Sequence, residues 1–173
     1  MAERPAFIAN IHDGLTPLND GGFADMKGLG SPVGRAGGLT RLGVHYEITP
    51  PGGRSSFPHA ESDEDEFVLV LKGFPDVWID GELHELVEGD CVSFPAGSGI
   101  AHSFLNNSSE DMHLLIVGEA NKESNRINYP LNPERMAEFA KRGRAWLDAP
   151  KRALGPHDGI ARAGTRTAPH VLS

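Results

Sequence analysis

Residues 53–73 read GRSSFPHAESDEDEFVLVLKG, and residues 89–106 read GDCVSFPAGSGIAHSFLN. Both stretches place histidine or acidic residues at short intervals between glycines. Side chains two apart on an extended strand share one face, so His59 and Glu61 are expected to point the same way. The two stretches therefore predict a site in which an imidazole and a carboxylate bind one ligand together.

Two further residues extend this set. Glu66 opens the next apolar run, and His102 lies on a later β-like segment. Two imidazoles with carboxylates suit one divalent transition metal, and Zn²⁺, Mn²⁺, Fe²⁺, Ni²⁺ and Co²⁺ all stay open as its identity. The absence of a thiolate among these residues favours a site with open positions over a closed structural zinc site.

The surrounding sequence predicts short strands joined by tight turns. The run from Phe67 to Leu71 is apolar throughout, which is typical of a strand buried on both faces. Asp80 and Gly81 separate two β-like segments and indicate a two-residue hairpin. Short strands at close spacing with glycine-rich turns predict an all-β sandwich or barrel.

Three parts of the chain differ in character. Residues 1–38 are rich in glycine without strand or helix periodicity, and we expect an extended N-terminal arm. Residues 39–118 carry the predicted barrel. Residues 119–173 form a C-terminal extension with a helix expected at about 133–147, because Asn132 can cap it and proline follows at the first helical position.

Composition limits the partners and the compartment. The 173 residues suit one domain with a sizeable core. The net charge of −8 disfavours nucleic acid and anionic membranes, because both attract basic surfaces. Cys91 is the one cysteine, and we expect it to be a buried, unreactive thiol. With no apolar run long enough to cross a bilayer and no signal-peptide pattern, we expect a soluble cytoplasmic protein.

The two stretches resemble the two motifs of the cupin family. The first motif is matched by Gly53, His59, Glu66 and Gly73, and the second by Gly89, Pro95, Gly97, His102 and Asn106. The chain departs from the pattern at Glu61, which stands where the first motif has its second histidine. It also has four residues between Gly97 and His102, where two are usual.

The resemblance implies a cupin double-stranded β-helix, or jelly-roll barrel, and it implies His59, Glu66 and His102 as metal ligands. Glu61 is either a fourth ligand or a residue that moves protons. Arg54, Tyr46 and Phe104 are the residues we expect to contact a substrate.

The function predicted from these features is that of a metal-dependent small-molecule enzyme. Arg41, Arg54 and Lys72 are the basic residues between 41 and 118, which favours a neutral sugar or a monoanionic acid over a phosphorylated sugar. An isomerase-like reaction is the first hypothesis. An O₂-dependent dioxygenase and a non-catalytic ligand-binding module are the alternatives. A homodimer is expected, as cupins often pair through sheet edges and terminal arms.

Overall fold

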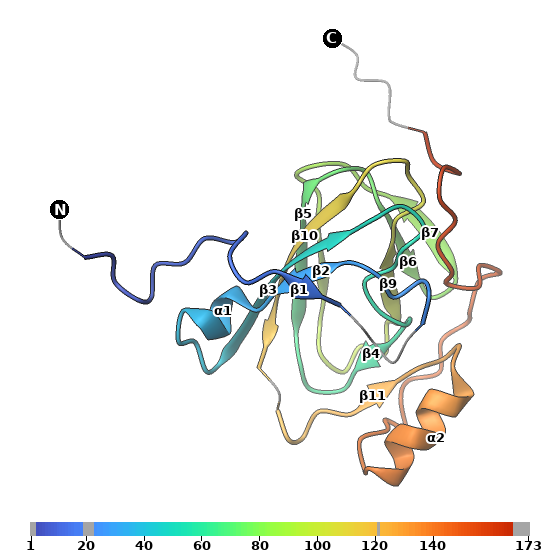
Figure 1. Cartoon of the computed structure of the whole chain (residues 1–173). Helices are drawn as coiled ribbons and strands as arrows, with labels where there is room; N and C mark the ends of the chain where they lie inside the picture. Colours follow the sequence, from blue (N-terminus) through green and yellow to red (C-terminus); the bar gives the residue numbers. More distant parts are fainter. Residues whose placement is uncertain (1–2, 19–22, 121, 168–173) are drawn as a thin grey trace.

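The computed structural model of the chain describes residues 3–18, 23–120 and 122–167. Figure 1 shows an all-β body with two antiparallel sheets facing each other, an N-terminal arm on one side and the helix α2 below. The larger sheet has the strand order β1-β2-β3-β10-β5-β8, the second has β7-β6-β9, and β11 pairs with β4.

The elements are short, as the turn-rich sequence predicts. The strands of the larger sheet are β1 (Thr16–Pro17), β2 (Leu29–Ser31), β3 (Leu42–Thr49), β5 (Glu66–Lys72), β8 (Cys91–Phe94) and β10 (Met112–Glu119). The remaining strands are β4 (Ala60–Glu61), β6 (Asp76–Ile79), β7 (Glu82–Glu85), β9 (His102–Leu105) and β11 (Ile127–Asn128). The helices are α1 (Val33–Ala36) and α2 (Pro133–Lys141).

The core lies between the two sheets. Strand β10 occupies the centre of the larger sheet, pairing with β3 on one side and β5 on the other. Strands β5, β6, β8, β9 and β10 each contribute one face to the larger of two buried clusters, as period-two alternation requires. Its members are Val68, Val70, Val77, Leu86, Phe94, Phe104, Met112 and Leu114. The predicted all-β architecture is confirmed.

The hairpin between β6 and β7 is also confirmed. Asp80 has a φ of 47° and Gly81 a φ of 92°, the left-handed values that a two-residue hairpin needs. The turn also packs against the C-terminal tail, because a Cβ at Gly81 would lie 2.3 Å from the Gly155 nitrogen. Only glycine meets both demands here.

Strand β5 is buried on one face only, so the expectation of two buried faces is wrong. Val68 and Val70 point into the core, whereas Phe67 on the other face keeps 37% of its surface exposed. Cys91 is opposite Leu69 on this outer face and is exposed, so the expected buried thiol is wrong too. An unbroken apolar run cannot reveal by itself which face of a strand is covered.

Both ends of the chain are more structured than the sequence suggests. The described part of the N-terminal arm contains β1, β2 and α1, and β2 adds a strand to the sheet beside β3. Helix α2 begins as predicted, with Asn132 Oδ1 accepting a hydrogen bond from the Arg135 N–H at 2.9 Å. It ends at Lys141, well before residue 147, because Gly143 turns the chain with a φ of 66°.

Neither helix in the described part of the chain is long and apolar enough to span a membrane.

The C-terminal tail is strapped across the smaller sheet by buried polar contacts. Trp78 Nε1 donates to the His157 carbonyl at 2.8 Å. Farther along the tail, Arg166 forms an ion pair with Asp76 at 2.8 Å, and both side chains are 6% exposed. Arg166 also donates to the carbonyls of Leu86 and Pro75. A buried charge with this many partners holds the tail in one position.

We therefore expect Arg166→Ala to lower the free energy of unfolding by about 3–5 kcal/mol, because it leaves the Asp76 carboxylate buried without its partner. Arg162→Ala is the control, since Arg162 pairs with Asp158 on the exposed surface and its loss should cost far less. Urea unfolding measures both variants. Equal losses of unfolding free energy in the two variants would contradict the role of Arg166 in holding the tail.

Candidate metal centre

Two backbone hydrogen bonds bring His59 and His102 together. The His59 N–H donates to the His102 carbonyl at 3.1 Å, and the His102 N–H donates to the His59 carbonyl at 2.9 Å. The two imidazole rings are consequently 4.9 Å apart, centroid to centroid. The two sequence motifs meet at this pair, one histidine from each.

The His59 ring is held in the form that binds metals. Its Nδ1 lies 2.9 Å from the Phe57 carbonyl, and it donates its proton there, so Nε2 keeps a free lone pair. Burial, followed by the charges of His102 and Arg135, lowers the pKa of His59 to about 4, against the opposing effects of Glu66 and the Phe57 hydrogen bond. The imidazole is therefore neutral at physiological pH, as a ligand must be.

Glu66 and His102 face each other directly. Glu66 Oε1 lies 3.0 Å from His102 Nε2, and the Phe94 ring stacks on the imidazole at 3.5 Å between centroids. Burial raises the pKa of Glu66, but the hydrogen bond and the nearby charges of His102 and His59 outweigh it and the net shift is downward. Glu66 is thus an ionised carboxylate beside two imidazoles.

Glu61 lies on the two-stranded sheet formed by β4 and β11. It belongs to β4 and is opposite Ile127 of β11. Burial, followed by the negative charges of Glu64 and Glu66, raises the pKa of Glu61 to about 7, and Asn125 and Arg144 offset part of the rise. A carboxyl with this pKa exchanges protons readily near neutral pH. The segment from Arg54 to His59 makes only two isolated β-bridges, so it is not the continuous strand that the sequence suggested.

The acids between Glu61 and Glu66 stabilise the loop. Asp65 Oδ1 accepts a hydrogen bond from the Ala96 N–H at 2.7 Å. Glu64 accepts from the Lys122 N–H, and Asp63 accepts from the Ser124 hydroxyl. These contacts attach the acidic loop to the segments that follow β8 and β10.

A small cavity of about 190 Å³ opens at this end of the barrel. It is lined by Gly43, His45, Glu61, Glu64, Asp65, Glu66, Ile116, Gly118, Glu119 and Ala120. We call it the mouth cavity. It gives a small molecule access to both Glu61 and Glu66.

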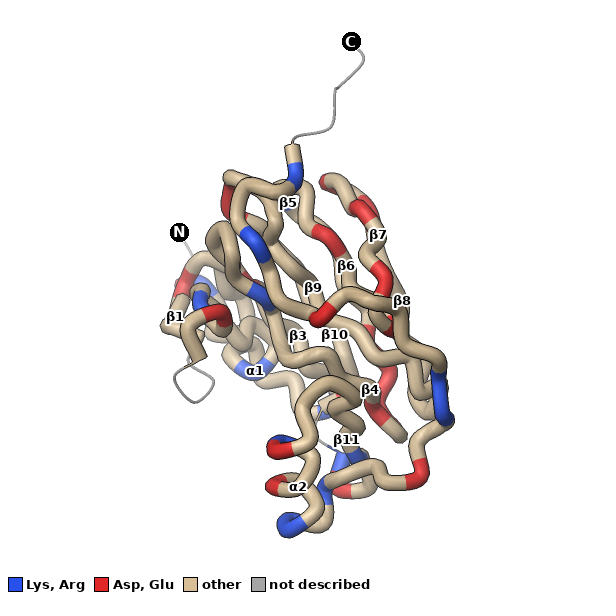
Figure 2. The backbone as a smooth tube through the Cα atoms, turned by 90° about the vertical axis from the view of Figure 1, so that its right-hand side faces the viewer, with Lys and Arg blue, Asp and Glu red and all other residues tan. Residues whose placement is uncertain are grey.

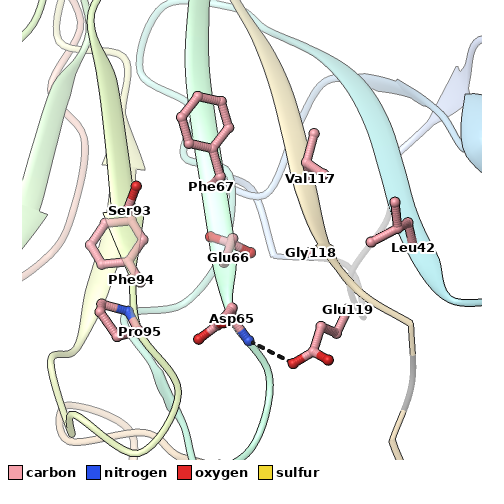
Figure 3. Close-up of a pocket in the computed structure, with 10 residues that line it drawn as sticks. All are labelled: Leu42, Asp65, Glu66, Phe67, Ser93, Phe94, Pro95, Val117, Gly118 and Glu119. Carbon is pink, nitrogen blue, oxygen red and sulfur yellow. Dashed lines mark hydrogen bonds between the residues drawn. The ribbon is translucent and has the colours of Figure 1, made fainter.

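A wider groove of about 480 Å³ begins beside the same residues and runs onto the outer face of the larger sheet. Figure 3 shows Glu66 and Asp65 at one end and the apolar side chains of Phe67, Val117 and Leu42 around the groove. It joins the candidate site to an exposed apolar surface.

The residues fit a divalent ion by donor type. Among the described residues, no group of three or more His, Cys, Asp or Glu side chains is placed so that it could hold a metal ion as the side chains stand. His59, His102 and Glu66 nevertheless are neighbours that offer the donor types such an ion prefers, two imidazole nitrogens and a carboxylate. Because the Glu66 carboxylate can only accept a hydrogen bond, His102 Nε2 is the donor, and an ion held by both groups would take the place of that proton.

The three predicted substrate contacts lie elsewhere. Arg54 is buried and ties the two ends of the chain together, with Nε 2.9 Å from Asp25 and Nη1 donating to the Gly159 carbonyl at 3.0 Å. Phe104 lies in the core with its ring edge against Phe94.

Tyr46 is on the face of β3 opposite to its neighbours His45 and Glu47. Its hydroxyl lies 2.6 Å from His113 Nδ1, beneath the arm residue His12. None of the three substrate candidates lines the mouth cavity.

The C-terminal extension supplies residues that the sequence analysis missed. The Tyr129 ring lies 6.0 Å from the His59 ring, and the Arg135 guanidinium stacks over Tyr129 and Phe57 at 5.0 and 4.8 Å. Figure 2 shows basic positions around β11 and α2, close to β4. No sequence pattern connects Tyr129 and Arg135 with the two motifs, because they lie outside the motifs in the sequence.

Glu47 was also missed, although a signal for it exists. Alternation along β3 places His45, Glu47 and Thr49 on one face, an unusual set for a strand that lines a core. Burial, followed by the charge of Glu66, raises the pKa of Glu47 to about 7.

Comparisons with known proteins identify the family of the chain. A family model described as "Cupin domain" matches residues 45–118. The crystal structure of a sugar phosphate isomerase from a cupin superfamily, from Silicibacter pomeroyi, is 30% identical over 74% of this chain and 73% of its own, with a TM-score of 0.55. The chain belongs to the cupin superfamily.

Two solved structures of lower identity support the fold alone. A protein from Acidithiobacillus ferrooxidans that carries the name of a sugar phosphate isomerase is 23% identical, with a TM-score of 0.67 over 72% of this chain and 81% of its own. The polyketide cyclase RemF from Streptomyces resistomycificus is 17% identical, with a TM-score of 0.57 over 81% and 97%. No curated protein sequence matches the chain.

Asn125 links the extension to the acidic loop of this cupin. It is 1% exposed, and its Oδ1 accepts from the Asp63 N–H at 3.1 Å and from the Ser62 hydroxyl at 3.4 Å. We expect Asn125→Ala to destabilise the protein by about 1–3 kcal/mol and to speed hydrogen exchange at the Asp63 amide. Hydrogen-exchange mass spectrometry should show no such local change in the control Asn128→Ala. Unchanged exchange over residues 61–64 in Asn125→Ala would refute the link.

Proposed function

We propose that this cupin binds one divalent transition metal and acts on a small molecule, in an isomerase-like reaction on a sugar or a sugar or hydroxy acid. The observation that carries the proposal is the meeting of His59, His102 and Glu66 beside the mouth cavity. The relative from Silicibacter pomeroyi, named a sugar phosphate isomerase, supports the reaction class.

Each residue has a distinct role in this proposal. His59 through Nε2, together with His102 and Glu66, would hold the ion, which when bound acts as a Lewis acid toward a carbonyl or hydroxyl group. Glu61, with its pKa raised to about 7, would take a proton from a substrate carbon or hydroxyl in the mouth cavity and return it elsewhere. Phe94 keeps the His102 ring fixed by stacking on it.

The proposed substrate carries at most one anionic group. Within residues 41–118 the sequence offers few cations, and Arg54 is engaged with Asp25 and Gly159. The C-terminal extension adds Arg135 near His59 and Arg144 near Glu61, as their effects on the pKa values of those groups indicate. A sugar acid or a sugar with one phosphate is thus compatible with the site, beside a neutral sugar.

An O₂-dependent dioxygenase is the second candidate, because two histidines and one carboxylate also form the iron-binding triad of oxygenases. A binding module without turnover is the third. All three use the same pocket, so substrate screening has to separate them.

Metal analysis tests the shared premise. Purified protein should contain or take up a stoichiometric transition metal, and His59→Ala and His102→Ala should each lose it, because each removes an imidazole ligand. His84→Ala is the control, since His84 is exposed on β7, away from the pair. Mass spectrometry of the metal content reads out all four proteins.

Activity and binding assays on the same proteins separate the three candidate functions. An isomerase should convert a sugar or sugar acid without oxygen, a dioxygenase should consume O₂, and a binding module should bind without turnover. If the wild-type protein binds no transition metal after metal addition, the catalytic proposal fails.

We further propose a homodimer in the cytoplasm. The outer face of the larger sheet exposes Phe67 by 37% and Leu42 by 48%, and the arm exposes Phe7 by 73%. Apolar surface of this extent is commonly covered by a partner, and a second copy offers both the sheet face and the arm. The single cysteine requires no oxidising compartment.

Light scattering after size exclusion should give twice the chain mass of 18.6 kDa. Phe67→Glu should shift the protein toward the monomer by placing a charge in the covered face. Leu83→Glu, at an equally exposed position on β7, should remain dimeric. A wild-type protein that elutes cleanly as a monomer would disprove the dimer.

A further inference from the structure

The inner face of β3 carries three polar residues, His45, Glu47 and Thr49. Their partners across the sheet, in the same order, are Ile116, Leu114 and Met112 of β10. Since paired residues point to the same face, and Leu114 and Met112 are fully buried in the core, Glu47 and Thr49 face the barrel interior. His45 lies nearer the mouth cavity and is exposed.

Two of these side chains have unpaired polar atoms. Glu47 Oε2 and Thr49 Oγ1 are buried, and neither has a hydrogen-bond partner in the described part of the chain. An unpaired buried polar atom destabilises a fold, and a carboxylate oxygen does so most of all. The neighbours of Glu47 in its row, Leu114 and Val70, show that an apolar side chain would suit the packing. Glu47 therefore destabilises the fold at a position where packing does not require a carboxylate. This combination suggests that the carboxylate binds a ligand.

Glu47 shares the inner face of the larger sheet with Glu66, one of the proposed ligands. Glu66 lies on the inner face of the same sheet, two strands away, and its charge is the main influence on Glu47 after burial itself. Glu66 in turn is 3.0 Å from His102. Two carboxylates that repel each other through a low-dielectric interior are both stabilised by a cation placed between them.

We propose that Glu47 is a further carboxylate ligand of this metal centre, bound to the ion directly or through a water molecule. The inference deepens the proposed function and rests on it, because it requires that a metal binds. The ligand set becomes two imidazoles with two carboxylates, a harder set that favours ions such as Mn²⁺. Glu61, at the mouth cavity, is then left for proton transfer.

Calorimetric titration of the metal-free protein with Mn²⁺ tests the proposal. Glu47→Gln keeps the shape of the side chain and removes its charge, and it should weaken Mn²⁺ binding by at least about tenfold. Glu88→Gln, an exposed acid in the turn before β8, should bind as the wild type does. Co²⁺ substitution gives a second readout, because loss of a ligand changes the visible absorption of the bound ion.

A second variant guards against a folding artefact. Glu47→Met replaces the unpaired carboxylate with an apolar side chain, so the metal-free variant should melt at a higher temperature than the metal-free wild type while losing Mn²⁺ affinity. A lower melting temperature, or Mn²⁺ affinity in Glu47→Gln equal to the wild type, overturns the proposal. If His59→Ala abolishes Mn²⁺ binding but Glu47→Gln does not, this inference fails alone. If the wild type binds no transition metal, the proposed function fails with it.

Discussion

Two backbone hydrogen bonds join His59 to His102, and they hold together two segments that lie more than 40 residues apart in the sequence. Because of them, one imidazole from each motif lies within ring contact of the other, and Glu66 reaches His102 from the opposite sheet. The stacked Phe94 ring and the Phe57 carbonyl then fix the orientation of the two rings. The proposed chemistry depends on this local arrangement more than on the barrel as a whole.

The same arrangement explains why the interior carries acids at a cost. Glu47 and Glu61 both have pKa values raised to about 7, each by burial and by nearby negative charge. A barrel selected only for stability would hold apolar side chains at such positions. The C-terminal extension adds to this environment, since Tyr129 and Arg135 cover the His59 side of the site. In this chain the extension therefore belongs to the site as well as to the fold.

Short-range sequence signals predicted most of the fold. The Asp80-Gly81 turn and the Asn132 cap are local, and each specifies its conformation within a few residues. The glycine and histidine spacings of the two motifs placed His59, Glu66 and His102 in one barrel. Two features depend on contacts between residues that are distant in the sequence, so they could not be predicted from it. They are the exposed outer face at Phe67 and the approach of Arg135 to His59. The prediction that few cations lie near the site considered only residues 41–118, and it therefore missed Arg135.

Anomalous diffraction from a crystal grown with Mn²⁺ tests the central claim most directly, because it locates the ion without reference to activity. The account predicts one strong peak within bonding distance of His59 Nε2, His102 Nε2 and a Glu66 carboxylate oxygen. A peak held by other residues, or none at this site while Glu66 stays hydrogen-bonded to His102, would contradict it.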